Sequence, residues 1–336
     1  MSTSEENNSV TVEASARLHL GFIDPLGGSG RRYGSLGVAI RRPIVSINVE
    51  RIKRGIAVKG PSKQRVRDLV GIFKKHFRYS GGVRVTVREV IPEHIGLGSG
   101  TQLSLSIGAA IATLLEKEVN IQELARVAGR GEVSGIGTAT FERGGFVIDG
   151  GIPVPTDDEA AALLEGYVPP LLFRYDVPED WVFVVALPNL PRGFSGVAEE
   201  QAFSKMPPAQ TEQSNEIGRY VLMQLLPALV EGDILRFGAA LTTIQRLVGD
   251  CFATAQGGRF ADPVIATCIT AMLEAGAFGA GQSSWGPACY ALARWTTGLK
   301  AIRQAVSRVL DATCGGTIIA ARANNHGALI KGPKER

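Results

Sequence analysis

A cluster of small residues in the stretch 95–115, IGLGSGTQLSLSIGAAIATLL, could bind an anion. Leu103, Ile107, Ile111 and Leu114 recur at helical spacing, which predicts a helix that begins near Gly100. The start of a helix has unpaired backbone N–H groups and a partial positive charge, and glycines before it let a phosphate approach the backbone. A tight turn without a ligand is the alternative interpretation. The residues of this predicted anion loop are Gly96, Gly98, Ser99, Gly100, Thr101 and Gln102.

Two further segments are rich in glycine, SGIGT at Ser134–Thr138 and GAFGAGQSSWG at 276–286. The first loop is neither a Walker loop, since no Gly-Lys-Ser/Thr follows it, nor a dinucleotide-binding fingerprint, since its glycine spacing differs. Each loop by itself is weak evidence for an anion-binding site. Three of them in one chain indicate a site for several anionic groups between two lobes.

The elements that must position the first loop lie in the first half of the chain, where the hydrophobic patterns alternate between strand and helix periods. In chain order these are a strand over 10–20, a glycine-rich loop over 21–37, a hairpin that turns at 53–55, an amphipathic helix over 63–77, a strand over 83–87 and a short helix over 121–129. Residues 129–151 are expected to be loop and turn, apart from a strand-like segment over 144–149.

An acidic, proline-rich stretch between Asp157 and Pro178 predicts a boundary, so we divide the chain into lobes over 1–165 and 175–336. The elements predicted for the second lobe are a strand over 181–187, helices over 213–229, 234–248 and 263–275, a glycine loop that runs into a strand over 276–293, a helix over 300–312 and a strand over 316–323. This β, α, β ending indicates a split β-α-β lobe.

The charge of the chain is unevenly distributed. The 336 residues carry a net charge of +4, and the sequence pI is about 8.9. Between Arg31 and Arg67, eleven Lys or Arg residues stand against one acid, Glu50. This run is either a solvated basic face of the predicted hairpin or an electropositive rim for an anionic substrate. Aromatic residues are not interleaved with the basic ones, so we expect no nucleic acid partner.

The cysteines and the apolar runs bear on the compartment. Cys251, Cys268, Cys289 and Cys314 are far apart and have no metal-binding spacing, so we expect reduced thiols in a cytoplasmic protein. The longest nearly apolar run, Leu103–Leu115, has 13 residues. It is too short to span a bilayer, so no membrane association is expected.

The order of these motifs resembles the GHMP kinase superfamily. The resemblance is carried by ARLHLGFID (16–24), IPEHIGLGSGTQ (91–102) and GAFGAGQSSWG (276–286). Many kinases of the superfamily have an aspartate in a Ser-Gly-x-Asp segment, whereas here Ser134-Gly135-Ile136 is followed by Gly137. This departure disfavours a homoserine kinase-like small-molecule kinase, which we keep as the alternative.

A closer resemblance is to the β-ribofuranosylaminobenzene 5′-phosphate synthases of the same fold group. It is carried by segment 16–24, by GRGEVSGIGTATFERGGFVIDGG (129–151) and by VLMQLLPALVEGDILRFGAAL (221–241). The resemblance implies an α+β fold with two lobes, the N-terminal one similar to ribosomal protein S5 and the C-terminal one a ferredoxin-like split β-α-β lobe.

The resemblance also implies a reaction. Enzymes of this family join phosphoribosyl pyrophosphate to 4-aminobenzoate, or to 4-hydroxybenzoate in some members, and release pyrophosphate and carbon dioxide. They generally use Mg²⁺, act in tetrahydromethanopterin biosynthesis and form homodimers. The choice between the amino and the hydroxy acceptor stays open at this point.

For this chemistry we expect the loop Gly96–Gln102 to hold the pyrophosphate, with Mg²⁺ bridging its oxygens. The 5′-phosphate would lie either at Ser134–Thr138 or at Gln282–Gly286, and arginines would supply positive charge. Outside the first loop, the predicted substrate-binding residues are Arg130, Ser134, Gly135, Gly137, Thr138, Arg143, Gln282, Ser283, Ser284, Trp285 and Gly286.

Four residues are catalytic candidates. Asp24 or Asp149 could stabilise an oxocarbenium-like ribose, although turn-forming or capping roles would explain both equally. Arg17 and His19 lie two residues apart on the predicted strand, hence on one face, and could contact the carboxylate of the acceptor or a phosphate. Trp285 could stack on the acceptor ring or anchor the core.

Overall fold

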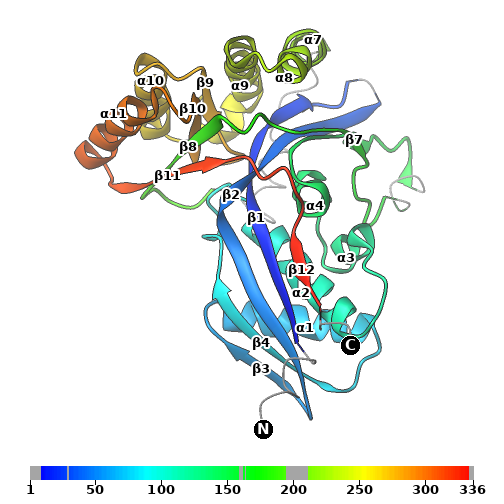
Figure 1. Cartoon of the computed structure of the whole chain (residues 1–336). Coiled ribbons are helices and arrows are strands. Elements are labelled where there is room, and N and C mark those ends of the chain that lie inside the picture. Colours follow the sequence, from blue (N-terminus) through cyan, green and yellow to red (C-terminus); the bar gives the residue numbers. More distant parts are fainter. Residues whose placement is uncertain (1–8, 29, 159–161, 163, 194–210, 333–336) are drawn as a thin grey trace.

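The computed structural model describes residues 9–28, 30–158, 162, 164–193 and 211–332. Two sheets form the framework (Figure 1). The larger sheet has the strand order β12-β1-β2-β4-β3, and β5, β6 and β7 extend it from β2. Its strands are β1 (Ser9–Asp24), β2 (Arg31–Ile52), β3 (Ile56–Lys59), β4 (Gly82–Glu89), β5 (Phe146–Asp149), β6 (Ile152–Pro153), β7 (Leu171–Tyr175) and β12 (Leu329–Lys331).

Helices pack on the large sheet (Figure 1). They are α1 (Lys63–His76), α2 (Ser99–Leu114), α3 (Ile121–Val127) and α4 (Ile136–Arg143). Helices α2 and α4 lie directly against β1 and β2, while α1 and α3 pack against α2. Helix α2 is buried along most of its length because other elements surround it. Its first turn therefore stays fixed relative to β1.

The smaller sheet contains β8 (Trp181–Pro188), β9 (Gly279–Gln282), β10 (Cys289–Arg294) and β11 (Gly316–Arg322). All neighbours in its order β11-β8-β10-β9 are antiparallel, which is the ferredoxin-like arrangement. The described helices that follow β8 in the chain are α7 (Thr211–Tyr220), the π-helical turn η2 (Val221–Leu225), α8 (Leu226–Glu231), α9 (Ile234–Gln256), α10 (Pro263–Glu274) and α11 (Leu299–Ala312).

Strand β8 is apolar throughout because both of its faces are buried. Val182, Val184 and Ala186 pack in a cluster with residues of α10 and α11. The alternating residues Trp181 and Phe183 belong to the main core, which also contains residues of β1, α2 and α9. One continuous core thus runs from the large sheet into the second lobe. None of the described helices is long and apolar enough to cross a membrane.

The expected α+β fold with two lobes is confirmed, including the strand at 181–187 and the helix that starts next to Gly100. The predicted hairpin at 53–55 is wrong, because β4 lies between β2 and β3, and β3 pairs with β4 in parallel. The C-terminal strand β12, from the part assigned to the second lobe, pairs with β1 in the large sheet. The division of the chain near residues 165–175 stays a prediction.

Three glycine-rich segments that were predicted to be loops contain regular secondary structure. The expected loop over 21–37 is largely strand, since β1 continues to Asp24 and β2 begins at Arg31. Residues 129–151 contain helix α4, and the glycine loop over 276–286 contains strand β9. Gly37 illustrates the reason: a Cβ there would lie 2.1 Å from Cγ2 of Ile136. That glycine lets α4 approach the sheet and does not mark a turn.

Candidate active site

The loop before α2 has the geometry of an anion site. Gly96 and Gly98 adopt φ values of 87° and 77°, in the left-handed region that favours glycine. Gly98 is the N-cap of α2 and provides no side-chain cap, and the first turn of the helix has no acidic residue. The amides at this helix end are therefore available to a negatively charged group.

Three arginines from separate elements surround this helix end. Arg17 of β1 donates from Nη1 to the Gly96 carbonyl at 2.5 Å. A Cβ placed on Gly100 would lie 2.7 Å from Nη2 of Arg65 and 3.4 Å from Nη1 of Arg130. We call Gly98–Gly100 together with these three arginines the anion cradle. Arg65, from α1, is a site residue that the sequence analysis did not single out.

Two arginines of the cradle lie close together. Arg65 pairs with Glu93 at 3.0 Å. Arg130 is largely buried, and burial together with the positive charge of Arg65 lowers its pKa, while the charge of Glu132 offsets part of this effect. Its Nε has no hydrogen-bond partner among the described residues. Two neighbouring guanidinium groups in a partly desolvated position favour binding of an anion.

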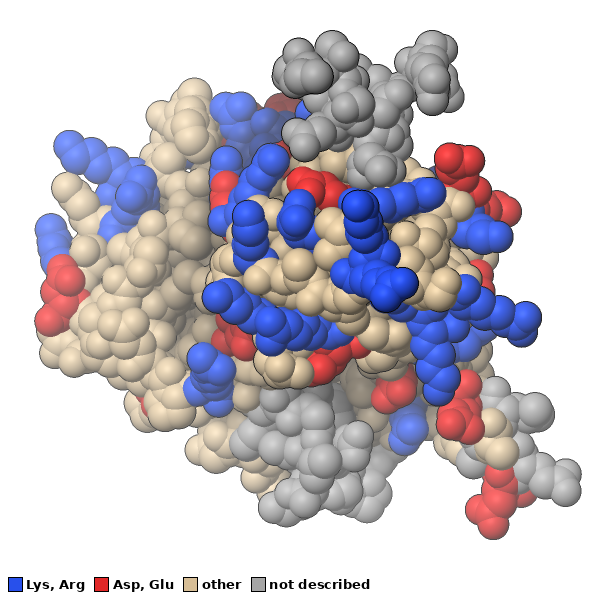
Figure 2. Space-filling model, turned by 90° about the horizontal axis from the view of Figure 1, so that it is seen from below, with Lys and Arg blue, Asp and Glu red and all other residues tan. Residues whose placement is uncertain are grey.

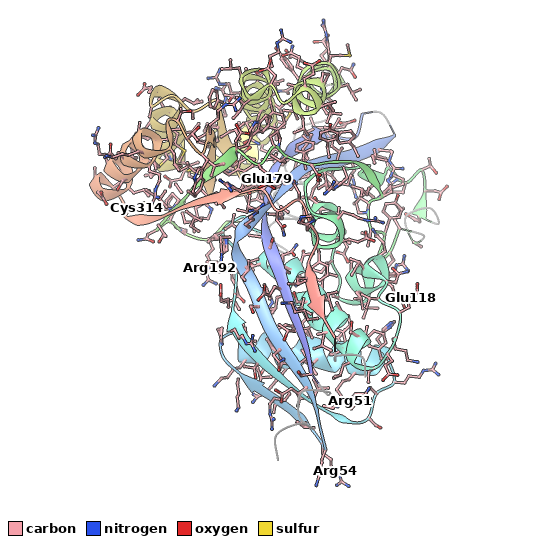
Figure 3. The ribbon with its side chains drawn as sticks, in the orientation of Figure 1. Arg51, Arg54, Glu118, Glu179, Arg192 and Cys314 are labelled. Carbon is pink, nitrogen blue, oxygen red and sulfur yellow. The ribbon has the colours of Figure 1, made fainter. Side chains whose placement is uncertain are left out.

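The residues of the basic run 31–67 lie in different parts of the structure. Arg51 and Arg54 lie at the far end of the large sheet (Figure 3), where Lys and Arg side chains gather on the lower surface (Figure 2). Arg65, in contrast, lies beside the first turn of α2. The run is thus mostly a solvated face, and it contributes one arginine to the cradle.

Ser283 joins the cradle loop to the second lobe. Its hydroxyl donates to the Gly96 carbonyl at 2.7 Å and accepts from the His19 backbone N–H at 3.0 Å. The side chain is fully buried. Both hydrogen-bonding functions are used within the protein, so Ser283 holds β1, the loop before α2 and the loop after β9 together.

His19 is buried and neutral. Its Nδ1 accepts from the Gly21 backbone N–H at 3.3 Å, which places the ring proton on Nε2. This Nε2–H has no partner among the described residues. Burial, reinforced by the charge of Arg17, lowers the pKa of His19 to about 3. His19 therefore offers a neutral hydrogen-bond donor rather than a cation.

This environment predicts a pH-dependent stability. A histidine that stays neutral in the folded protein but has an ordinary pKa of 6.5 when unfolded contributes stability above pH 6.5, which is lost as the pH falls toward 3. We expect the free energy of unfolding to fall by about 2 kcal/mol more in the wild type than in His19→Phe between pH 7.5 and pH 5. Urea unfolding of both proteins at both pH values measures this difference. Equal pH dependence would show that His19 is not the group responsible.

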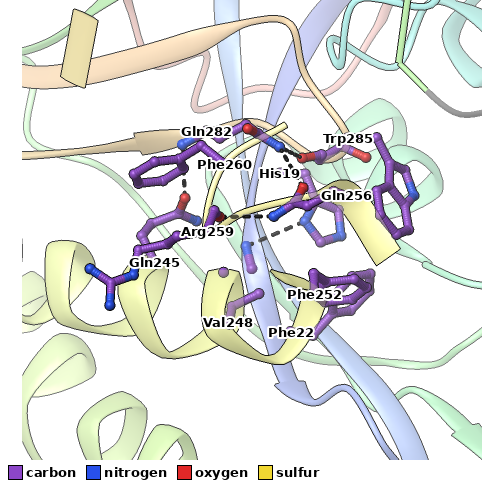
Figure 4. Close-up of a pocket in the computed structure, with 13 residues that line it drawn as sticks. His19, Phe22, Gln245, Val248, Phe252, Gln256, Arg259, Phe260, Gln282 and Trp285 are labelled. Atoms are coloured by element: carbon purple, nitrogen blue, oxygen red, sulfur yellow. Dashed lines mark hydrogen bonds between the residues drawn. The ribbon is translucent and has the colours of Figure 1, made fainter. Parts of the chain in front are cut away.

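A pocket with aromatic walls lies beside His19 (Figure 4). It is formed by the end of β1, by α9 and by the loop after β9, and the open space in it, counted with the solvent at its mouth, is about 440 Å³. The described residues that line it are His19, Gly21, Phe22, Gln245, Val248, Gly249, Phe252, Gln256, Arg259, Phe260, Gln282, Ser284 and Trp285. Predicted residues His19, Gln282, Ser284 and Trp285 thus meet at one pocket.

The second predicted anion loop already has an anion. The carboxylate of Asp149 accepts hydrogen bonds from the backbone N–H groups of Gly135, Ser35 and Gly151 at 2.8 to 3.0 Å. Asp149 is fully buried; burial raises its pKa, and these three donors offset part of that effect. Its carboxylate therefore lies at the start of α4, where Ser134 and Thr138 were expected to meet a phosphate.

Thr101 and Gln102 face α4 rather than the cradle. Gln102 is buried and donates from Nε2 to the Gly137 carbonyl at 2.9 Å. A Cβ on Gly137 would lie 2.9 Å from Cγ2 of Thr101. These two residues, which stand where a kinase of the superfamily usually has small ones, attach α2 to α4.

Other predicted residues lie away from the cradle. Asp24 accepts from the Gly27 N–H and the Ser214 hydroxyl, in a turn at the end of β1. Arg143 is exposed at the last turn of α4 and lies 3.7 Å from Glu142. Gly286, in contrast, borders the cradle loop: it adopts a φ of 69° in the turn between β9 and β10, and its carbonyl oxygen lies 3.5 Å from the Cβ position of Gly96. No group of three or more His, Cys, Asp or Glu side chains that could hold a metal occurs among the described residues.

Comparison with known proteins identifies both halves of the chain. Residues 64–145 match the GHMP kinases N terminal domain, and residues 225–312 match the GHMP kinases C terminal domain. The chain is 32% identical over 330 residues to the beta-ribofuranosylphenol 5'-phosphate synthase of Methanothermobacter thermautotrophicus, which covers 95% of this chain and 98% of that protein. The corresponding enzyme of Archaeoglobus fulgidus is 34% identical and covers 82% and 85%.

Solved structures show the same fold at lower identity. The homoserine kinase from Cytophaga hutchinsonii matches with a TM-score of 0.66 over 96% of this chain and 98% of that one. The two sequences are 18% identical. This similarity concerns the fold alone.

Proposed function

We propose the function of this chain from one premise: the chain belongs to the family of beta-ribofuranosylphenol 5'-phosphate synthases, which have the GHMP kinase fold. The chain is accordingly a pentosyltransferase, and this function takes precedence over the homoserine kinase-like alternative. The names of the relatives place a phenol in the product, so we favour 4-hydroxybenzoate over 4-aminobenzoate as the acceptor.

The proposed reaction joins phosphoribosyl pyrophosphate to 4-hydroxybenzoate. The ring carbon that bears the carboxylate forms a bond to the anomeric carbon, and pyrophosphate leaves with the electron pair of the broken C–O bond. The bond from the ring to the carboxylate then breaks, its electron pair returns to the ring, and carbon dioxide is released. The product is β-ribofuranosylphenol 5′-phosphate.

The observation that carries this proposal is the anion cradle, with its partly uncompensated Arg130, next to an aromatic pocket. The cradle suits the pyrophosphate, which gains negative charge as it leaves. The departing pyrophosphate then lies beside the oxocarbenium-like ribose and stabilises it. Because Asp149 occupies the start of α4, this helix end is not free to bind the 5′-phosphate of the donor.

Mg²⁺ stays a proposed cofactor, and the residues around the cradle fit it. Guanidinium and amide groups bind phosphate oxygens and not the metal, so the ion would be held mainly by the pyrophosphate. Mg²⁺ sites of this kind need one or two carboxylates in addition. Glu132 is exposed, and its charge acts on Arg130 of the cradle. Its carboxylate is the proposed protein ligand.

One assay tests the proposed function. The protein is incubated with phosphoribosyl pyrophosphate, Mg²⁺ and 4-hydroxybenzoate labelled in its carboxyl group. We expect labelled carbon dioxide and pyrophosphate in equal amounts. Formation of ADP from ATP and homoserine, without release of label, would overturn the proposal in favour of the kinase.

A charge placed at the cradle tests its ligand. Ser99 is the first residue of α2 and partly exposed. We expect Ser99→Asp to weaken binding of phosphoribosyl pyrophosphate about 100-fold, because its carboxylate would compete for the arginines and repel the pyrophosphate. Ser99→Asn has the same shape without the charge and should change affinity much less. Titration calorimetry measures both affinities. Equal affinities of the two variants for phosphoribosyl pyrophosphate would show that the pyrophosphate does not bind in the cradle.

A homodimer is proposed from the family resemblance, through the outer surface of η2, α8 and α9 (Figure 1). Leu222, Met223, Val230 and Leu235 are large apolar side chains that are more than half exposed there. Neighbouring residues of the same helices, such as Leu225 and Leu229, are buried in the core. The stretch therefore serves both packing and, in our proposal, association.

Light scattering coupled to gel filtration tests the dimer. We expect the wild type to have twice the mass of the chain and Met223→Glu to shift to the monomer, because a carboxylate would be desolvated in an apolar interface. Leu172→Glu, at another exposed apolar side chain, should stay dimeric. A monomeric wild type would contradict the proposal.

A further inference from the structure

We propose that the aromatic pocket is the acceptor site, and that the Nε2–H of His19 holds the carboxylate of 4-hydroxybenzoate during the attack. This inference rests on the proposed function and adds where the acceptor binds and which group orients it.

The walls of the pocket suit a planar ring. The ring centroids of His19 and Phe22 are 4.6 Å apart, and those of Phe22 and Phe252 are 5.7 Å apart. Trp285 stands at 89° to Phe252, with centroids 5.0 Å apart. These rings pack on one another at edge-to-face or tilted angles and form one aromatic wall of the pocket (Figure 4). A benzoate ring would bury apolar area against this wall.

The electrostatics of the pocket exclude the donor and admit the acceptor. Among the described lining residues, Arg259 alone carries a full charge, and both of its bonds go to the carboxylate of Asp250, at 2.7 and 3.0 Å. The amide of Gln245 is also used within the protein, since it donates to the Leu20 carbonyl and accepts from the Gln282 N–H. A pyrophosphate, with several negative charges, would lose its hydration without gaining a free cation here. The acceptor has one carboxylate, which the Nε2–H of His19 can meet, on an otherwise mostly apolar ring.

His19 stands between the pocket and the cradle. Its backbone N–H donates to Ser283, whose hydroxyl donates to the Gly96 carbonyl in the cradle loop. Arg17, two residues earlier on β1, contacts that same carbonyl. If the pyrophosphate of the donor lies in the cradle, the ribose attached to it lies on the side of His19. The ring carbon of the acceptor that is held next to His19 is therefore the one closest to the ribose. This carbon must be the one that bears the carboxylate, since it forms the new bond.

A neutral donor at this position suits a carboxylate that must leave. The Nε2 proton is fixed because Nδ1 accepts from Gly21, and the Nε2–H has no other partner among the described residues. An arginine would stabilise the carboxylate charge most in the bound acceptor, and that stabilisation is lost as carbon dioxide forms. A single hydrogen bond from a neutral imidazole orients the carboxylate with a smaller penalty in the transition state.

Filling the pocket tests the assignment. Val248 lines it from α9, and we expect Val248→Phe to raise the KM for 4-hydroxybenzoate at least tenfold while the KM for phosphoribosyl pyrophosphate stays within twofold. His19→Phe keeps a ring in the wall but removes the donor, and it should raise the KM for the acceptor and lower kcat. Ile72→Phe adds the same ring on the exposed side of α1 and should behave as the wild type.

A label on the wild type covers the case in which these variants do not fold. Photolysis with 4-azidobenzoate should attach to residues 19–22, 245–260 or 282–286, and 4-hydroxybenzoate should prevent the attachment. Attachment elsewhere, or an unchanged acceptor KM in folded Val248→Phe, overturns the assignment while an active wild type keeps the proposed function. A wild type that releases no carbon dioxide overturns both.

Discussion

Replacing Arg130 by methionine is expected to weaken binding of phosphoribosyl pyrophosphate about 100- to 1000-fold without destabilising the free protein. The two effects have one cause. Burial and the charge of Arg65 disfavour the charged guanidinium of Arg130 in the unliganded site. A bound anion relieves this repulsion. Arg130 therefore lowers the free energy of unfolding of the unliganded protein and strengthens the binding of the anion.

Methionine keeps the aliphatic stem and removes the charge. We therefore expect the free energy of unfolding of Arg130→Met to equal that of the wild type or to exceed it by about 1 kcal/mol. Donor affinity is measured by calorimetry, and stability by urea unfolding without ligand.

Arg143→Met is the matched control for this experiment. Arg143 is exposed, and its ion pair with Glu142 is long. The same substitution there should change donor affinity less than twofold, although the sequence had indicated Arg143 as a binding residue. If both variants lost affinity equally, the effect would be one of overall charge and the cradle would not be the donor site.

The sequence predicts those features of the site that depend only on residues adjacent in the chain. The apolar spacing after Gly100 and the glycines before it predicted an anion-binding helix end, and α2 begins at Ser99. Glycines with left-handed φ values, a missing cap and a first turn without acids are all properties of neighbouring residues. Such properties can be deduced from a short stretch.

Arg65 shows what could not be predicted. Its helix was predicted from the helical spacing of Val66, Leu69, Val70, Phe73 and Phe77. Which end of that helix meets the first turn of α2 depends on how α1 packs, and this packing is set by contacts between distant segments. The hairpin was wrongly predicted for the same reason. Strand β3 pairs with β4, which follows it in the chain only after helix α1.

Helix α4 was missed because its sequence, IGTATFER, contains glycine, threonine and other weak helix formers. Contacts outside the helix stabilise it. The carboxylate of Asp149 lies at its first turn, and Ile136 packs against Gly37 of β2. The second glycine-rich segment, predicted to be a loop that binds a phosphate, is thus the start of a helix, and the negative group next to it is a side chain of the protein.

Gly96→Ala is expected to have the largest effect on the fold of the site. A Cβ on Gly96 would lie 2.2 Å from the carbonyl oxygen of Ser283, and the residue has a φ of 87°. The oxygen belongs to the backbone of the loop after β9, so it cannot move as a side-chain end would. We expect the free energy of unfolding to fall by about 4 kcal/mol or more.

Gly55→Ala separates the two contributions. Gly55 has a similar φ of 78°, and nothing lies within 4 Å of its Cβ position. The control should lose about 1–2 kcal/mol from backbone strain alone, and the excess loss in Gly96→Ala then measures the contact between the cradle loop and the second lobe. Urea unfolding gives both values. Equal losses would mean that the two lobes can separate at this contact at little cost, and Ser283 could then not fix His19 against the cradle.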